Sequence, residues 1–113
     1  MYVRLFFPSR DRNGQTIESH TVGAVFAATR AALVDLAGGV TALAGTGSWR
    51  AADGAVMTEN VTMFETYAPA GQATLVAVSD LAHAIARDLD QESVFYVVDG
   101  RPYTAAGSTS DAA

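Results

Sequence analysis

The chain contains no cysteine and no lysine, and each absence excludes a class of chemistry. Without cysteine there is no disulfide, no thiolate zinc ligand and no thiol nucleophile. Without lysine there is no Schiff base and no P-loop lysine. All seven positive side chains are arginines, which are scattered along the 113 residues, and the net charge is −5. Because a nucleic-acid-binding protein normally carries a basic patch, we expect no nucleic acid partner.

Long apolar runs are also absent. No segment reaches the ~18–20 apolar residues that a membrane span needs. The apolar run at the N-terminus ends at Pro8 and is too short for a signal peptide. We therefore expect a cytoplasmic protein without membrane association. Half of the residues are hydrophobic and only 17% are charged, which predicts one folded domain.

Two segments have the periodicity of amphipathic helices. Apolar residues recur at three- and four-residue steps from Thr21 to Ala37, and Gly38-Gly39 provides a C-terminal stop. Ser19 or Thr21 can cap the start of this helix. A second apolar stripe runs from Gln72 to Leu89.

Four further segments are rich in branched and aromatic residues, as strands are. These predicted strands are Tyr2 to Phe7, Val40 to Arg50, Val56 to Tyr67 and Ser93 to Val98. The order β-α-β-β-α-β predicts a ferredoxin-like α+β fold, in which a four-stranded antiparallel sheet carries both helices on one face. We expect residues 1–104 to form a single domain and residues 105–113 to be a flexible C-terminal tail.

Asp53-Gly54 predicts a tight turn between the second and third strands. A two-residue turn there would place Trp49 opposite Thr58 and Leu43 opposite Phe64. The stretch Gly45-Thr46-Gly47 predicts a bulge that would redirect Trp49.

Neither face of the predicted strands is wholly polar, although a sheet with one wet face should alternate cleanly between apolar and polar residues. The helix-free face is therefore too apolar for a lone subunit. We expect a homodimer packed sheet to sheet. The alternative is that the loop at residues 9–20, or the tail, covers this face.

Two sequence pieces resemble a family of small bacterial proteins known only as a domain of unknown function. One piece comprises Gly39-Val40-Thr41, Gly47-Ser48-Trp49-Arg50, Gly54 and Glu59, and the other is Gln91-Glu92-Ser93-Val94. The resemblance implies the four-stranded, two-helix plan and no activity. The dimeric α/β-barrel proteins, which include monooxygenases, isomerases and chlorite-type haem enzymes, share that plan, but a shared fold does not establish a function.

Six residues are candidates for a binding site on this sheet: Arg4, Trp49, Glu59, Glu65, Tyr67 and Tyr96. Arg4 and Glu65 lie on neighbouring strands, where they would form either a polar anchor for a small ligand or a structural ion pair. Trp49 would line a pocket or cap the core edge. Gln91 and Glu92 would point into a pocket mouth. Alternatively, Glu92 would pair with Arg87 or Arg101, or hydrogen-bond turn amides.

The two histidines, His20 and His83, match no metal-binding signature, so we expect no metal and no cofactor. Three hypotheses remain open. The chain is a small-molecule-binding module that uses the open sheet face, a cofactor-free isomerase- or monooxygenase-like enzyme with Glu65 or His20 as the acid or base, or a protein-interaction and assembly domain.

Overall fold

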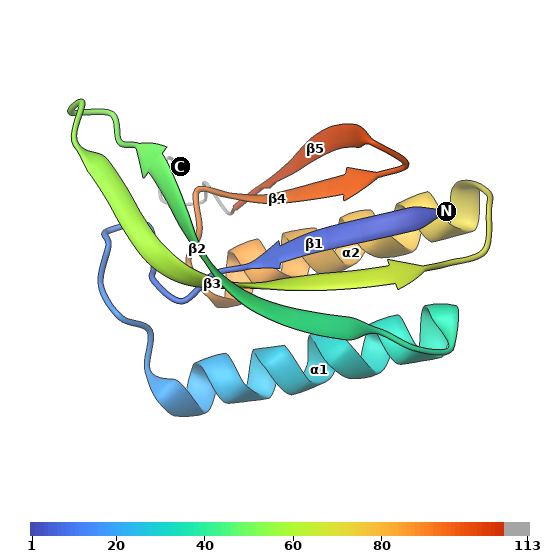
Figure 1. The fold of residues 1–113 in the computed structure, drawn as a ribbon. Coiled ribbons are helices and arrows are strands. Elements are labelled where there is room, and N and C mark those ends of the chain that lie inside the picture. Colours follow the sequence, from blue (N-terminus) through green and yellow to red (C-terminus); the bar gives the residue numbers. More distant parts are fainter. Residues whose placement is uncertain (108–113) are drawn as a thin grey trace, which may run out of the picture.

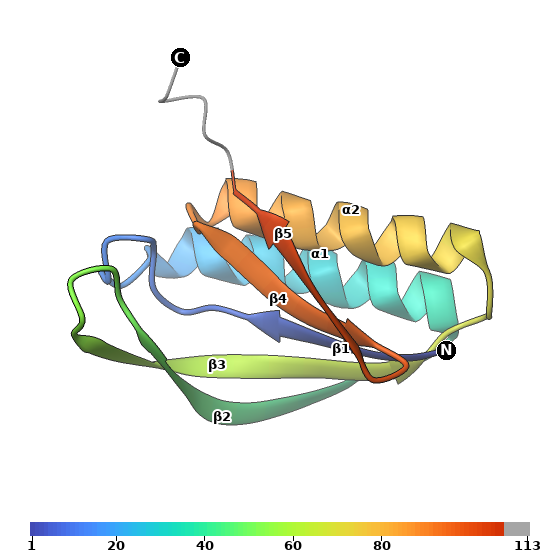
Figure 2. The same cartoon turned by 90° about the horizontal axis from the view of Figure 1, so that it is seen from above.

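The structure, a computed structural model, describes residues 1–107, and this part of the chain forms five strands and two helices (Figure 1). Their bounds are β1 (Tyr2–Phe7), α1 (Ser19–Ala37), β2 (Thr41–Arg50), β3 (Val56–Tyr67), α2 (Gln72–Asp88), β4 (Ser93–Val98) and β5 (Arg101–Ala106). All strands belong to one antiparallel sheet in the order β2-β3-β1-β4-β5. Both helices cover the same face of the sheet (Figure 2). The predicted α+β class is confirmed, but the predicted number of strands is wrong.

The missed strand is β5, which pairs with β4 along its whole length, from Val98↔Arg101 to Ser93↔Ala106. The turn between them is Asp99-Gly100, whose φ angles are 51° and 78°. Two successive left-handed residues form the hairpin turn that Asp-Gly sequences favour. Ala105 and Ala106, which the sequence predicted to be in the flexible tail, therefore belong to β5, and Ala105 is fully buried. Gly107 follows, and its N–H donates to the Glu92 carbonyl at 2.8 Å. The remaining tail residues, 108–113, lie outside the described residues.

The β2–β3 register differs by one residue from the predicted one. Trp49 pairs with Met57, and Leu43 pairs with Met63. The cause is the turn, in which the Ala51 N–H donates to the Ala55 carbonyl and the Gly54 N–H donates to the Ala51 carbonyl. Gly54 has a φ of 89°, so the hairpin has a three-residue loop that ends in a left-handed glycine.

This one-residue shift changes which side chains share a face of the sheet. The ladder is continuous through Gly45↔Val61 and Gly47↔Glu59, so the predicted bulge is absent. Trp49 consequently lies on the same face as Glu59, which the two-residue turn would have placed on the opposite face.

The core lies between the sheet and the two helices. Val3, Leu5 and Phe7 alternate along β1 toward the helices and are at most 2% exposed. Phe7 packs edge-on against Phe64 of β3, with ring centroids 5.9 Å apart. The intervening residues of β1 point to the other side of the sheet, which we call the open face because no helix covers it (Figure 2).

Both helices begin and end close to the predicted positions. Gly38 caps α1 in the left-handed conformation, as expected. The N-cap is Glu18 rather than Ser19 or Thr21, because the Glu18 carboxylate accepts the N–H groups of His20 and Thr21. Within residues 1–107, neither helix combines the length and the hydropathy that crossing a membrane would require.

Candidate functional site

The open face of the sheet carries an open cleft of about 670 Å³, which we call the sheet cleft. One wall is the β2–β3 hairpin, and the opposite wall is the loop that follows β1. The segment leading into β4 closes one end of the cleft. Its lining residues are Phe6, Pro8, Asp11, Arg12, Asn13, Gly14, Gly47, Ser48, Trp49, Arg50, Ala51, Ala52, Met57, Glu59, Val61, Gln91, Glu92, Ser93, Val94 and Phe95.

Glu59 is the buried charged residue of the sheet cleft, with only 7% of its surface exposed. Its Oε1 atom accepts the backbone N–H of Ser9 at 2.8 Å and that of Arg10 at 2.9 Å. The Ser9 hydroxyl donates to the same oxygen at 3.3 Å. Among the described residues, no hydrogen bond reaches Oε2. The fold therefore holds the carboxyl group through one oxygen and leaves the other available to the cleft.

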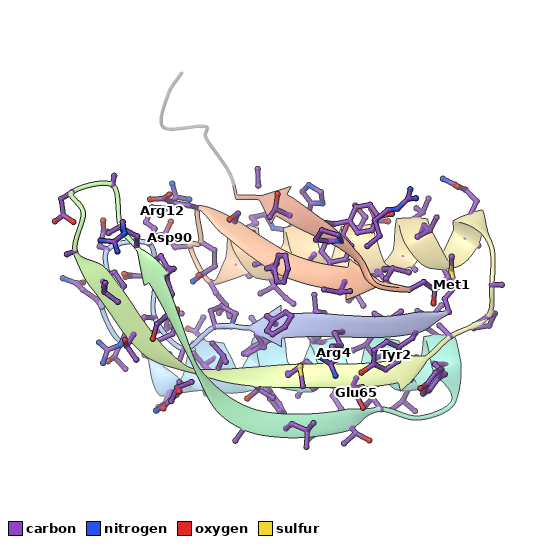
Figure 3. The ribbon with its side chains drawn as sticks, turned by 45° about the horizontal axis from the view of Figure 1, so that its top comes forward. Met1, Tyr2, Arg4, Arg12, Glu65 and Asp90 are labelled. Carbon is purple, nitrogen blue, oxygen red and sulfur yellow. The ribbon has the colours of Figure 1, made fainter. Side chains whose placement is uncertain are left out.

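The loop that forms one cleft wall is fastened to the segment that leads into β4 and closes one end of the cleft. Gln91 donates through Nε2 to the Arg10 carbonyl at 2.7 Å, and Arg12 forms an ion pair with Asp90 at 2.8 Å (Figure 3). Gly14, with a φ of 77°, lies so close to Met57 that a Cβ atom would stand 2.7 Å from the Met57 methyl carbon. The left-handed backbone favours glycine at this position. The loop is therefore tied to the segment before β4 through Gln91 and Asp90.

Aromatic side chains supply the apolar surface of the cleft. The Phe6 and Phe95 rings lie 5.2 Å apart, and Trp49 is 44% exposed. Gly47 faces Glu59 across the β2–β3 ladder, and a Cβ atom there would touch only Val61, at 3.4 Å. The missing side chain at Gly47 keeps the cleft open beside the carboxylate.

A second polar cluster lies elsewhere on the open face (Figure 3). Arg4 and Glu65 pair in register, with Nε and Oε2 3.3 Å apart, so the predicted pairing is confirmed. Between them, Tyr2 accepts a hydrogen bond from Arg4 at 2.6 Å and donates one to Glu65. The hydrogen bond to Glu65 raises the pKa of Tyr2 above its ordinary value. The exposed Tyr67 ring packs beside Tyr2 at 5.0 Å.

The six predicted site residues therefore divide among three places. Trp49 and Glu59 line the sheet cleft, whereas Arg4, Glu65 and Tyr67 belong to the second cluster. Tyr96 points to the helix side, where it stacks on Tyr103 and lines a separate groove of about 340 Å³ beside α2.

Sequence reasoning missed Phe6, Phe95 and the backbone amides of the loop as parts of the cleft. The signal for the aromatic pair was strand alternation, which places both rings on one face. Gln91 lines the cleft and also donates through Nε2 to the Leu89 carbonyl at 2.8 Å. His20 and His83 are exposed and lie outside the cleft lining. Within residues 1–107 there is no group of three or more His, Asp or Glu residues that could hold a metal ion.

A family model described as "Protein of unknown function (DUF3574)" matches residues 3–103. The chain belongs to the DUF3574 family. The match includes both sequence pieces that carry the resemblance, and it spans both helices, β2, β3, β4, β1 from its second residue and the first half of β5. The expected membership of a small domain-of-unknown-function family is thus confirmed. No curated protein matches this DUF3574 chain.

Among solved structures, two chains of phage SAM lyase are similar to the DUF3574 chain. The lyase in complex with S-methyl-5'-thioadenosine has a TM-score of 0.70 at 16% identity, over 93% of this chain and 88% of that one. The apo lyase has a TM-score of 0.66 at 19% identity, over 93% and 87%. At these identities the similarity establishes a shared fold.

Proposed function

We propose that this domain binds a small molecule in the sheet cleft. The cleft volume of about 670 Å³ falls within the range of small-molecule sites. Its lining combines aromatic surface with a buried carboxylate, as sites that orient a ligand do. The observation that carries the proposal is Glu59, which is 93% buried and offers one oxygen to the cleft.

The similar phage enzyme suggests the first ligand to test. That protein was solved with S-methyl-5'-thioadenosine, a nucleoside thioether with a flat base and an apolar methyl group. The exposed Trp49 ring offers a surface on which a base can stack, and such contacts contribute about 1–3 kcal/mol per base in nucleic-acid complexes. We therefore infer an adenosine-type ligand for this cleft.

A block of the cleft tests this proposal. In Gly47→Val, the new side chain extends into the cleft next to Val61, so binding of S-methyl-5'-thioadenosine should fall at least about tenfold, measured by isothermal titration calorimetry. The matched control is Gly45→Val, which lies on the same face of β2 but outside the cleft lining. The control should bind like the wild type. Equal affinity in all three proteins would contradict the proposed site, as would a complete lack of binding to the wild type.

The second candidate function is a lyase-type enzyme, because both similar structures are SAM lyases. The acid–base role that the sequence suggested for Glu65 or His20 passes in this proposal to Glu59, since neither of those two residues lines the cleft. Incubation with S-adenosylmethionine and chromatographic detection of S-methyl-5'-thioadenosine tests this activity. Product formed equally fast by Glu59→Gln would exclude Glu59 as the base.

We also propose that the chain is a homodimer, as its sequence predicts. Leu43 and Tyr67 on the open face are 45% and 74% exposed and lie outside the cleft lining, so a second copy packed on this face would cover them. An assembly role without a ligand is the remaining alternative. The cytoplasmic location stays a prediction.

A further inference from the structure

The charged residues that line the sheet cleft differ in which protein groups hydrogen-bond or pair with their side chains. They are Asp11, Arg12, Arg50, Glu59 and Glu92. Asp11 accepts the backbone N–H groups of Asn13 and Gln15 in its own loop. Arg12 pairs with Asp90, and Arg50 donates to the Gly54 carbonyl.

Glu59 stands apart from this set because its side chain is buried and receives only neutral donors. Its hydrogen bonds come from two backbone amides and one hydroxyl, all on Oε1. The ion pairs among the described residues join Arg4 to Glu65, Arg12 to Asp90 and Arg87 to Asp88, and none involves Glu59. A buried carboxylate is costly unless a positive charge accompanies it.

The surroundings of Glu59 also suit a positive charge on a ligand. Phe6, Trp49 and Phe95 line the same cleft, and aromatic faces attract cations. We propose, building on the proposed ligand-binding function, that the sheet cleft selects an organic cation. In this arrangement the charged centre, a sulfonium or an ammonium, lies against Oε2 of Glu59, and the flat part of the ligand lies on the aromatic wall.

Two probes that differ by one methyl group and one charge test this selection. S-methyl-5'-thioadenosine is neutral, and its S-methylated derivative, 5'-dimethylsulfonio-5'-deoxyadenosine, carries a sulfonium charge. The wild type should bind the cation at least about tenfold more tightly, measured by calorimetry at low salt. In Glu59→Gln this preference should vanish while the neutral probe keeps its affinity. The amide oxygen of glutamine can still accept the Ser9 and Arg10 N–H groups, so the fold should persist, and circular dichroism checks this.

Glu65→Gln is the matched control, because Glu65 is a carboxylate on the same open face that lies outside the cleft lining. It should keep the tenfold preference. Equal binding of the two probes to the wild type would overturn the cation selection and leave the proposed function standing. A preference that survives in Glu59→Gln would also overturn it. Failure of both probes to bind would overturn the proposed function, and the cation selection with it.

Discussion

Glu59 and Gln91 are two buried polar side chains that hold the same loop from opposite sides. Glu59 accepts the backbone N–H groups of Ser9 and Arg10, and Gln91 donates to the Arg10 carbonyl. Buried polar groups are nearly always hydrogen-bonded, and here the partners are backbone atoms of the loop. The two residues therefore explain why this cleft wall keeps a defined position, whatever ligand the cleft takes.

At the same scale, the pKa of the Tyr2 hydroxyl depends on its neighbour Glu65. Because the hydrogen bond to Glu65 raises the pKa of Tyr2 above 10.0, neutral tyrosine is favoured in the folded chain. This contribution to stability is present below pH 10 and is lost as the pH rises through the raised pKa.

The substitution Glu65→Ala should lower the pKa of Tyr2, since it removes the acceptor and leaves the Arg4 guanidinium, which favours the tyrosinate. A pH titration of the Tyr2 ring resonances by NMR measures the change. Tyr103, which contacts Tyr96 on the helix side, serves as an internal control. An unchanged Tyr2 titration would show that the hydrogen bond has no effect in solution.

At the scale of elements, β5 forms the edge of the sheet opposite β2. Its pairing with β4 moves β4 from the edge into the sheet and covers Val94 through the Val94↔Ala105 pair. Pro102 and Arg101 at the start of β5 are residues that protect an edge strand from pairing with other chains. The β2 edge of the sheet carries only Arg50 as a charged residue, so the two edges are not equally protected.

Ala105 and Ala106 form a matched pair that tests β5, because Ala105 is fully buried and Ala106 is exposed. Ala105→Glu should lower the free energy of unfolding by at least about 3 kcal/mol, since it buries an unpaired charge. Ala106→Glu should change it by no more than about 0.5 kcal/mol. Urea denaturation measures both variants. Two equally mild effects would mean that residues 105 and 106 are the flexible tail that the sequence predicted.

At the scale of the whole molecule, the two faces of the sheet differ in what covers them. The helices cover one face (Figure 2). Val3, Leu5 and Phe7 are buried on that face, whereas Leu43 and Tyr67 on the open face are exposed. The sheet cleft occupies only the end of this face near the β2–β3 hairpin. The rest is the surface on which we expect a second copy to pack.

A charge placed on the open face should separate such a dimer. Leu43→Lys should give a monomer at micromolar concentration in size-exclusion chromatography with light scattering, since burying the charge opposes sheet-to-sheet packing. Val34→Lys is the control, because Val34 is a similarly exposed apolar residue, at 41% against 45%, on the helix layer. A wild type that runs as a monomer would end the dimer proposal.

Most of the secondary structure could be predicted because it depends on local patterns. The periodicity of Gln72 to Leu89 and the alternation in Tyr2 to Phe7 depend on neighbouring residues alone, and both elements are found within one residue of the expected ends. The Arg4–Glu65 pair was also predictable, since it follows from the strand order.

The cleft depended on relations that no local pattern contains. The β2–β3 register depends on one extra residue in the turn at Gly54, and this residue moves Trp49 to the face of Glu59. Glu59 accepts a hydrogen bond from the Ser9 amide, fifty residues away in the chain. The sequence did not reveal β5, because the burial of Ala105 depends on its pairing with β4. The propensity of a segment to form a helix or a strand depends on adjacent residues. A binding site consists of groups that are distant in the chain, and only the packing of the chain brings them within hydrogen-bond reach.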